Sequence, residues 1–328
     1  MLHTKLRAVF AGAGLAMMGE PSVVSAVLSL TGKPENEIRM LYLGTATYDL
    51  PQFREKQTAA FSERGVTVTS LDVALAVPPE AAVSSAIDEA DVILVSGGCT
   101  LFAVDRWRRA KMVEPLRRAM ERGATLCGGS AGAGCWFDAL HSDSMDPDWY
   151  RDTMLAGRGA AAAKKPAEAT AHEKRAEGDG PPPWEYIRVP GLGFLPGLLC
   201  PHHDRTQSNG VLRSEDFANM LARHPGETGI AIDHFAALVI AEGSYRTLAL
   251  PGKPGSKTAS GANEPGKGTP AVWLKRIASG PSGAHVEERA LPEAGGLLEE
   301  LLVPATAIVE DPRVATARIE NPADDINS

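Results

Sequence analysis

The sequence Asp91-Val-Ile-Leu-Val-Ser-Gly-Gly98 is a continuous apolar run that ends in two glycines. Apolar residues at helical spacing precede it at residues 79–90 and follow it at residues 100–122. A short strand that is apolar on both faces and lies between two helices is typical of a parallel sheet covered on both sides. The run therefore predicts an α/β fold in which this segment is a central strand.

The same alternation of strands and helices continues on both sides of this run. Strands are expected at residues 7–11, 39–43, 66–71 and 124–127, and helices at residues 21–30 and 52–64. Repeated strand–helix–strand units predict a flavodoxin-like, doubly wound and mostly parallel sheet with helices on both faces. Ligands bind such sheets beyond the carboxyl ends of the strands, where Gly97-Gly98 and a second glycine-rich turn after residue 127 lie.

The second half of the chain is less regular. Strand-like runs occur at residues 229–233, 236–241 and 271–274, whereas residues 158–183 and 251–270 are rich in Gly, Pro and Lys. Segments of that composition do not bury enough apolar surface to form a core. We therefore predict a single α/β domain over residues 1–328, with low-complexity insertions at about residues 158–183 and 251–270 and a loosely held tail from about residue 313.

Composition and charge exclude several classes of protein. The 328 residues are 44% hydrophobic and 23% charged, as in globular proteins, and the net charge of −8 disfavours a nucleic acid or an acidic membrane surface as partner. An apolar stretch at residues 6–18 resembles a short signal peptide, but its glycines fit a first strand, a turn and a helix, which we favour. No apolar run elsewhere has the length of a transmembrane helix.

The four cysteines, at positions 99, 127, 135 and 200, form no CxxC pair and predict neither a zinc knuckle nor a thioredoxin motif. We expect free thiols in a reducing compartment, which favours the cytoplasm. Cys200-Pro-His-His203 holds two metal-ligating residue types, but adjacent histidines point in different directions and no second pair completes a tetrahedral site. We expect no metal and no organic cofactor.

The second glycine-rich turn, Gly128-Gly-Ser-Ala-Gly132, fits the pattern G-x-S-x-G. A serine between a strand and a helix lies on a strained turn that exposes its hydroxyl, and small neighbours let the turn close. The free N–H groups of the following helix favour a developing oxyanion. A strand precedes this motif and residues 131–140 can start a helix, so the context predicts that Ser130 is a nucleophile for hydrolytic acyl transfer.

A serine nucleophile needs a base, usually a histidine that a carboxylate orients. Eight histidines occur in the sequence. His202 is the most economical base because it follows a strand-like run into a turn, while His224 and His234 are alternatives. His141 is expected on or just after the helix that begins at the serine, pointing away from the turn.

The chain resembles the peptidase E and cyanophycinase family of serine peptidases. Four segments carry the resemblance, at residues 95–102, 128–133, 193–202 and 229–233, within a match over roughly residues 6–248. The resemblance implies a class I glutamine amidotransferase-like fold with serine in place of the nucleophilic cysteine. It also implies Ser130 as nucleophile, His202 as base and Asp233 as the orienting carboxylate.

The resemblance implies further site residues. The backbone N–H groups of Gly98 and Ala131 correspond to the oxyanion hole. Arg213 matches an arginine that meets the acidic side chain of the substrate, and Asp143 is a candidate for its α-amino group. The sequence departs from the family pattern at Cys99, where asparagine is frequent, and by the presence of His234 directly after the expected carboxylate.

Three functions follow as hypotheses. The first is a serine exopeptidase that hydrolyses Asp-Xaa dipeptides or related small acidic peptides, with a homodimer left open as its assembly. The second is a related amide or ester hydrolase; an α/β-hydrolase would need a carboxylate between serine and histidine, an order that Asp204 with His224 or His234 satisfies. The third is a non-catalytic, amidotransferase-like binding module.

Overall fold

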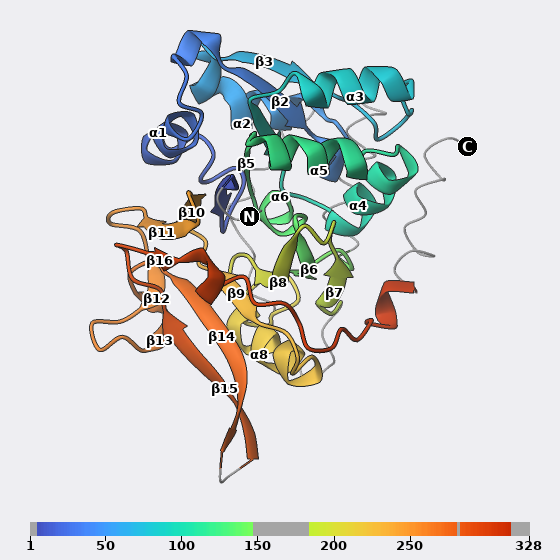
Figure 1. Cartoon of the computed structure of the whole chain (residues 1–328). Helices are drawn as coiled ribbons and strands as arrows, with labels where there is room; N and C mark the ends of the chain where they lie inside the picture. The colour runs from blue at the N-terminus through green and yellow to red at the C-terminus, as the bar shows by residue number, and fades with distance from the viewer. Residues whose placement is uncertain (1–4, 147–183, 281–282, 316–328) are drawn as a thin grey trace.

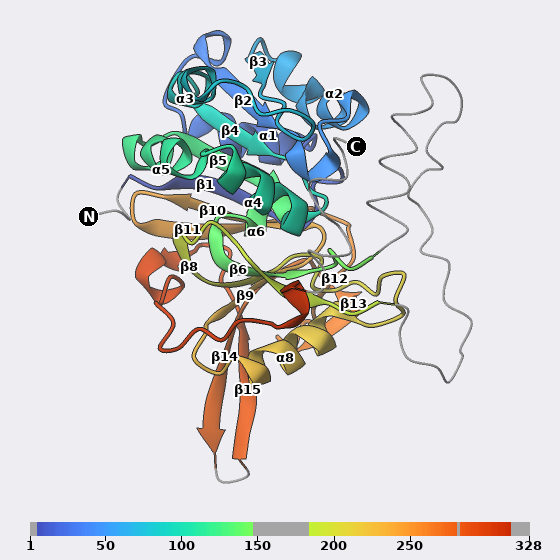
Figure 2. The same cartoon turned by 90° about the vertical axis from the view of Figure 1, so that its right-hand side faces the viewer.

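The computed structural model describes residues 5–146, 184–280 and 283–315. The predicted insertion at residues 158–183 and the end of the predicted tail, from residue 316, lie outside these ranges. Figures 1 and 2 show two sheets, an upper one between helices and a lower one from which a long hairpin projects. Within the described ranges, no helix is long and apolar enough to cross a membrane.

The upper sheet has eight strands in the order β16-β11-β10-β1-β5-β4-β2-β3. Its parallel part consists of β1 (Arg7–Ala11), β5 (Thr125–Gly129), β4 (Val92–Val95), β2 (Arg39–Leu43) and β3 (Thr67–Ser70). The remaining strands, β10 (Ala236–Ala241), β11 (Ser244–Ala249) and β16 (Gly296–Leu297), pair antiparallel beside β1. The predicted parallel core is therefore confirmed, but the sheet as a whole is mixed.

Helices cover both faces of this sheet, as predicted. The helices are α1 (Pro21–Ser29), α2 (Pro51–Ser62), α3 (Glu80–Asp88), α4 (Thr100–Arg109) and α5 (Val113–Arg122). Successive strand side chains point to opposite faces, so Val9 packs with α1 and α2, whereas Phe10 packs with α3, α4 and α5. Short 3₁₀ turns occur at Glu35–Glu37, Thr45–Thr47 and Leu298–Glu300.

The lower sheet has six strands in the order β15-β14-β9-β8-β6-β7. They are β6 (Phe137–Ser142), β7 (Ile187–Pro190), β8 (Leu195–Cys200), β9 (Gly229–Ile232), β14 (Val272–Gly280) and β15 (Gly283–Ala290). Only β6, β8 and β9 are parallel, so this sheet departs from the mostly parallel arrangement that we predicted. Helix α8 (Arg213–Arg223) packs on it through Phe217 and Leu221.

Two further segments differ from the sequence-based expectation. The helix expected from residue 131 is a single turn, α6 (Ala131–Gly134), and β6 begins at Phe137, because a glycine-rich turn is a poor helix former and the next residues are aromatic and apolar. Part of the predicted insertion at residues 251–270 forms a two-stranded sheet of β12 (Gly255–Lys257) and β13 (Asn263–Gly268), in which Ser256 is fully buried.

Candidate active site

Ser130 lies on the sharp turn between β5 and α6. Its backbone has φ 57° and ψ −121°, a left-handed conformation that strains a non-glycine residue. The neighbouring glycines make the turn possible, since a Cβ on Gly129 would lie 2.1 Å from the Ala13 carbonyl oxygen and one on Gly132 would lie 2.0 Å from that of Val95. The strand-turn-serine geometry that G-x-S-x-G predicts is therefore present.

His202 follows β8 and lines the same pocket as Ser130, a cavity of about 430 Å³ at the carboxyl ends of the parallel strands. Its backbone is also left-handed, with φ 49°, and its N–H donates to the Gly12 carbonyl oxygen at 3.3 Å. The Nδ1 atom of His202 lies 2.8 Å from Nδ1 of His234. In a hydrogen bond between two neutral imidazoles, one Nδ1 carries the proton and the other accepts it. When Nδ1 of His202 carries the proton, Nε2 of His202 is the unprotonated, basic nitrogen.

Asp233 is fully buried, and its carboxylate accepts hydrogen bonds from three neighbours. These bonds come from Nδ1 of His203 at 3.1 Å, from both N–H and Oγ of Ser256, and from the Ala271 N–H. The structure thus brings Ser130 and His202 to one pocket and places the Asp233 carboxylate on the neighbouring imidazole. This arrangement differs from the predicted one, in which Asp233 orients His202.

The two backbone groups predicted for the oxyanion hole lie on the turns that meet at Ser130. Gly98 has φ 127°, and a Cβ there would lie 2.2 Å from the Ala46 carbonyl oxygen, so the turn requires glycine. Ala131 is the first residue of α6, where the N–H has no partner within the helix. Across the described residues, neither N–H donates to a backbone carbonyl oxygen, so both are available to an oxyanion.

Asp143 lines the pocket, whereas Arg213 lies behind it. Arg213 is fully buried at the start of α8, and its Nη2 lies 3.3 Å from Oδ2 of Asp143. The same carboxylate oxygen accepts a hydrogen bond from Nε2 of Gln207 at 2.9 Å. The structure therefore joins the two predicted substrate-binding residues to each other and presents only Asp143 to the cavity.

Several pocket residues were missed by the sequence analysis. Asp146, Arg205 and Gln207 also line the cavity, as does His234, which the sequence analysis named as an alternative base. The Arg205 guanidinium lies 5.1 Å from the centre of the Phe235 ring, and its Nε is 3.6 Å from Oδ2 of Asp204. Arg205 and Gln207 belong to the turn after β8, so the rule that ligands bind at strand carboxyl ends could have identified them.

The cysteines lie in surroundings that do not suit catalysis, and His224, one of the two alternative bases, lies outside the catalytic pocket. All four thiols are free and buried, and burial raises the pKa of Cys99 to about 11 and that of Cys200 to about 12, so both are protonated at neutral pH. His224 lines a different cavity. Among the residues that the structure describes, no cluster of three or more His, Cys, Asp or Glu side chains could hold a metal ion.

Comparison with known families decides the class of protein. The family model described as peptidase family S51 matches residues 8–248, which include the nucleophile turn and the histidine turn. The chain belongs to peptidase family S51. It is therefore a member of a serine peptidase family, and the predicted membership of the peptidase E and cyanophycinase family is confirmed.

Three known proteins illustrate what this chain is similar to. The chain is 27% identical over 194 residues to the uncharacterized peptidase YgaJ of Bacillus subtilis (strain 168), covering 59% of this chain and 66% of that protein. It is 30% identical over 336 residues to a Trypanosoma brucei brucei protein named G2/mitotic-specific cyclin-1, covering 97% of this chain and 94% of that protein. A solved peptidase from an acI-B1 Actinobacterium shares the fold, with 14% identity, a TM-score of 0.51, and coverage of 88% of this chain and 98% of that chain.

Proposed function

We propose that this S51 peptidase is a serine exopeptidase that hydrolyses Asp-Xaa dipeptides or related small acidic peptides. The observation that carries the proposal is that the strained Ser130 and His202, from two different strand ends, line one cavity of about 430 Å³. A cavity of that size suits a short peptide rather than a folded substrate. The pocket is also lined by two carboxylate residues, Asp143 and Asp146, and by Arg205, and such charges suit recognition of a zwitterionic peptide.

In the proposed reaction, Nε2 of His202 accepts the Ser130 proton while Oγ attacks the scissile carbonyl carbon. The N–H groups of Gly98 and Ala131 donate to the resulting oxyanion. His202 then passes the proton to the leaving amine, the C–N bond breaks, and an acyl-enzyme forms. Water, deprotonated by His202, attacks this ester and releases the acid product with regeneration of Ser130.

Two groups hold the base in this proposal. His234 contacts His202 directly, and its backbone N–H donates to Oδ1 of Asp204 at 2.7 Å, which fixes the turn that carries it. Asp233 acts one residue away, by holding His203 and thus the turn after β8. The orienting role that the family resemblance gives to Asp233 would then be exerted through the backbone.

The substrate's charged groups have assigned partners in the proposal. Its α-ammonium binds Asp143, whose carboxylate is kept in place by Gln207 and Arg213. Its acidic side chain binds Arg205, the arginine that lines the cavity, because Arg213 is fully buried behind Asp143. The four free cysteines support a reducing compartment such as the cytoplasm, and a homodimer stays a prediction.

Hydrolysis of a dipeptide panel tests the proposal. Wild type and Ser130→Ala would be assayed on Asp-Xaa, isoaspartyl, neutral and N-acetylated dipeptides and on a simple ester. We expect Asp-Xaa peptides to be cleaved with the highest kcat/KM and the Ser130→Ala variant to be inactive. A preference for the ester or for neutral amides would instead indicate a hydrolase of other specificity. Failure of an active-site-directed phosphonate to label Ser130 would favour a non-catalytic binding module.

A further inference from the structure

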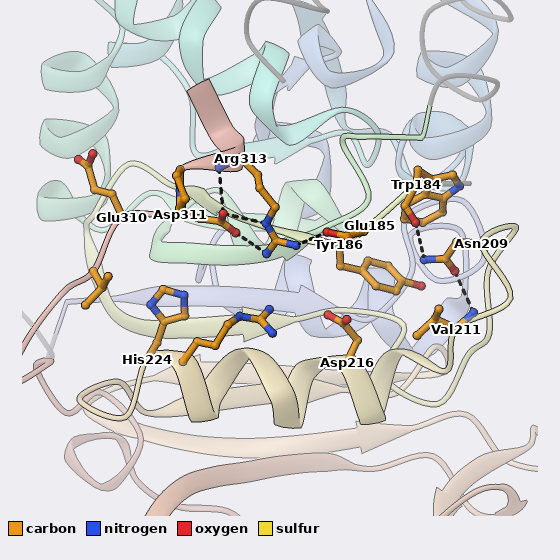
Figure 3. A pocket seen from close by; sticks show the side chains of 13 residues that line it. Trp184, Glu185, Tyr186, Asn209, Val211, Asp216, His224, Glu310, Asp311 and Arg313 are labelled. Carbon is orange, nitrogen blue, oxygen red and sulfur yellow. Dashed lines mark hydrogen bonds and ion pairs between the residues drawn. The ribbon is translucent and has the colours of Figure 1, made fainter. Parts of the chain in front are cut away.

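A second pocket of about 450 Å³ lies on the lower sheet, away from Ser130. Figure 3 shows α8 on one side of it, with Asp216 and His224 pointing inward, and the segment that carries Asp311 and Arg313 on the opposite side. Residues 184–186, which lead into β7, complete the wall. No step of the proposed reaction uses this cavity.

Two buried polar groups of residues that line the cavity make no hydrogen bond to a described residue, the Tyr186 hydroxyl and Nδ1 of His224. Tyr186 is 1% exposed, and its hydroxyl makes no hydrogen bond within the described part of the chain. The ring is held in place, because Trp184 packs edge-on at 5.0 Å and the Arg213 guanidinium lies 4.8 Å from its centre. A buried hydroxyl without a partner is unfavourable, so a polar ligand that bonds to it would be favoured.

The charges in the cavity divide into paired and available groups. Arg313 is occupied by Asp311 and Glu185, both at 2.7 Å. Asp216 and Arg223 lie two turns apart on the same face of α8 and both line the cavity. The Arg223 guanidinium makes no hydrogen bond to a described residue, and only one oxygen of Asp216, Oδ1, is bonded. Asp216 and Arg223 thus offer an anion and a cation to the same ligand, and Glu310 is a further carboxylate in the lining.

A chain of buried contacts joins this cavity to the catalytic pocket. Oδ1 of Asp216 lies 2.8 Å from Nε2 of His141, and Nδ1 of His141 accepts a hydrogen bond from Nε of Arg213 at 3.3 Å. Arg213 in turn pairs with Asp143, which lines the catalytic pocket. Because arginine only donates, Nδ1 of a neutral His141 must accept and Nε2 must donate to Asp216, so every link has a fixed direction.

We propose that this second cavity binds a small zwitterion bearing an α-ammonium and a carboxylate, namely a free amino acid or a dipeptide. The ammonium binds Asp216 and the Tyr186 hydroxyl, and the carboxylate binds Arg223. An ammonium at Asp216 competes with His141 for the carboxylate, which alters the support of Arg213 and hence of Asp143. Occupancy therefore changes the KM of the catalytic pocket. This last effect rests on the proposed peptidase function, whereas binding does not.

Calorimetric titration of the full chain tests binding without any need for activity. The probes are L-leucine and Gly-Leu, with N-acetyl-L-leucine and L-leucinamide as versions that lack the free ammonium or the carboxylate. We expect at least one zwitterion to bind and both blocked compounds to bind about tenfold more weakly or not at all. Stronger binding by L-leucine identifies a free amino acid as the ligand, and stronger binding by Gly-Leu identifies a dipeptide.

Variants locate the site. Arg223→Gln is expected to weaken binding about tenfold and Tyr186→Phe by a smaller factor, whereas Arg246→Gln on β11, an exposed arginine outside both pockets, is the matched control. Binding should persist in Ser130→Ala. Absence of binding by either zwitterion at millimolar concentration, or equal binding by wild type and a folded Arg223→Gln variant, would overturn the site. Loss of binding in Ser130→Ala would assign it to the catalytic pocket.

The coupling has its own readout. At a saturating concentration of the bound zwitterion, the KM for an Asp-Xaa substrate should change about threefold or more in wild type and not in Arg223→Gln, with a smaller change in kcat. Binding to the second cavity with an unchanged KM would overturn the coupling. If no dipeptide is hydrolysed at all, the proposed function fails while the calorimetric result still decides the site.

Discussion

The Nδ1 atoms of His202 and His234 lie 2.8 Å apart. The two histidines come from different turns, one after β8 and the other between β9 of the lower sheet and β10 of the upper sheet, so the contact lies where the chain crosses between the two sheets. In serine hydrolases a carboxylate usually fixes the tautomer of the base. Here a second imidazole occupies that position, and the proton between the two nitrogens decides whether Nε2 of His202 can act as a base.

Substitution of the two histidines should separate their roles. His202→Ala is expected to lower kcat by about 10³-fold or more, because it removes the base. His234→Ala should lower kcat by about 10-fold to 100-fold with little change in KM, because the base remains but its tautomer is no longer fixed. His285→Ala, an exposed residue on β15, is the control. Equal activity of His234→Ala and wild type would show that the contact has no catalytic role.

The strained backbone of Ser130 should reduce stability. With φ 57° at this position, glycine is better tolerated than alanine. We expect Ser130→Gly to exceed Ser130→Ala by about 1 kcal/mol in free energy of unfolding, although neither variant should hydrolyse peptides. Urea unfolding of both variants measures the difference. Equal stabilities would mean that the turn relaxes when the hydroxyl is lost.

Gly132, two residues after the nucleophile, is required for packing. A Cβ at Gly132 would lie 2.0 Å from the Val95 carbonyl oxygen, so Gly132→Ala should destabilise the protein by about 2 kcal/mol or more. Gly19→Ala is the matched control, because nothing lies within 4 Å of a Cβ there. Thermal unfolding of the pair checks the prediction. It is contradicted if both variants melt at the same temperature.

His141 should make stability depend on pH. Burial is the main cause that lowers its pKa from 6.5 to about 4, against the opposing effect of Asp216. The unfolded chain therefore binds more protons than the folded one between these values, so the free energy of unfolding falls as the pH is lowered from 6.5 to 4. His141→Gln should reduce this fall by an amount of the order of 3 kcal/mol. Urea titrations at pH 4.5 and 7 measure the free energy of unfolding of both proteins. An equal decrease in wild type and His141→Gln would argue against a buried neutral histidine.

Two arginines should affect substrate selection differently. Arg205 lines the catalytic pocket, so Arg205→Gln should raise the KM for Asp-Xaa dipeptides about tenfold and leave neutral dipeptides nearly unaffected. Arg213→Gln should weaken every dipeptide with a free α-ammonium, because the buried Asp143 loses its partner. Steady-state kinetics on Asp-Xaa and neutral dipeptides distinguish the two patterns. A selective loss of Asp-Xaa peptides in Arg213→Gln would return the acidic-side-chain role to that residue.

Much of the fold follows from local sequence patterns, but the strand directions of the second half do not. The parallel strands of the upper sheet were predictable, because β1, β2, β4 and β5 are mostly apolar runs next to glycine turns and β3 alternates between polar and apolar residues. The strand β6 was not predictable, because a nucleophile turn normally starts a longer helix, whereas α6 ends at Gly134. The antiparallel pairing of β10 with β1 joins residues more than 200 positions apart, and no local pattern encodes that contact.

The candidate active site could likewise be predicted only in part from the sequence. G-x-S-x-G identifies Ser130 because the chemistry requires a local turn. The partner of Asp233 is decided by a backbone rotation, for His202 adopts φ 49° and turns its ring toward the catalytic pocket while His203 meets the carboxylate. The sequence alone does not indicate which of two adjacent histidines faces the pocket and which one contacts the carboxylate. Arg205 likewise lines the pocket only because the turn after β8 directs it there.

The contact between Ser256 and Asp233 bears on how this protein could be shortened or recombined with its relatives. A glycine- and proline-rich segment looks dispensable, yet its Ser256 supplies both an amide and a hydroxyl to a carboxylate that has no access to water. Excising that segment would leave an anion enclosed in apolar surroundings with fewer donors. In a chimaera, residues 233 and 255–257 therefore need to be inherited from the same parent.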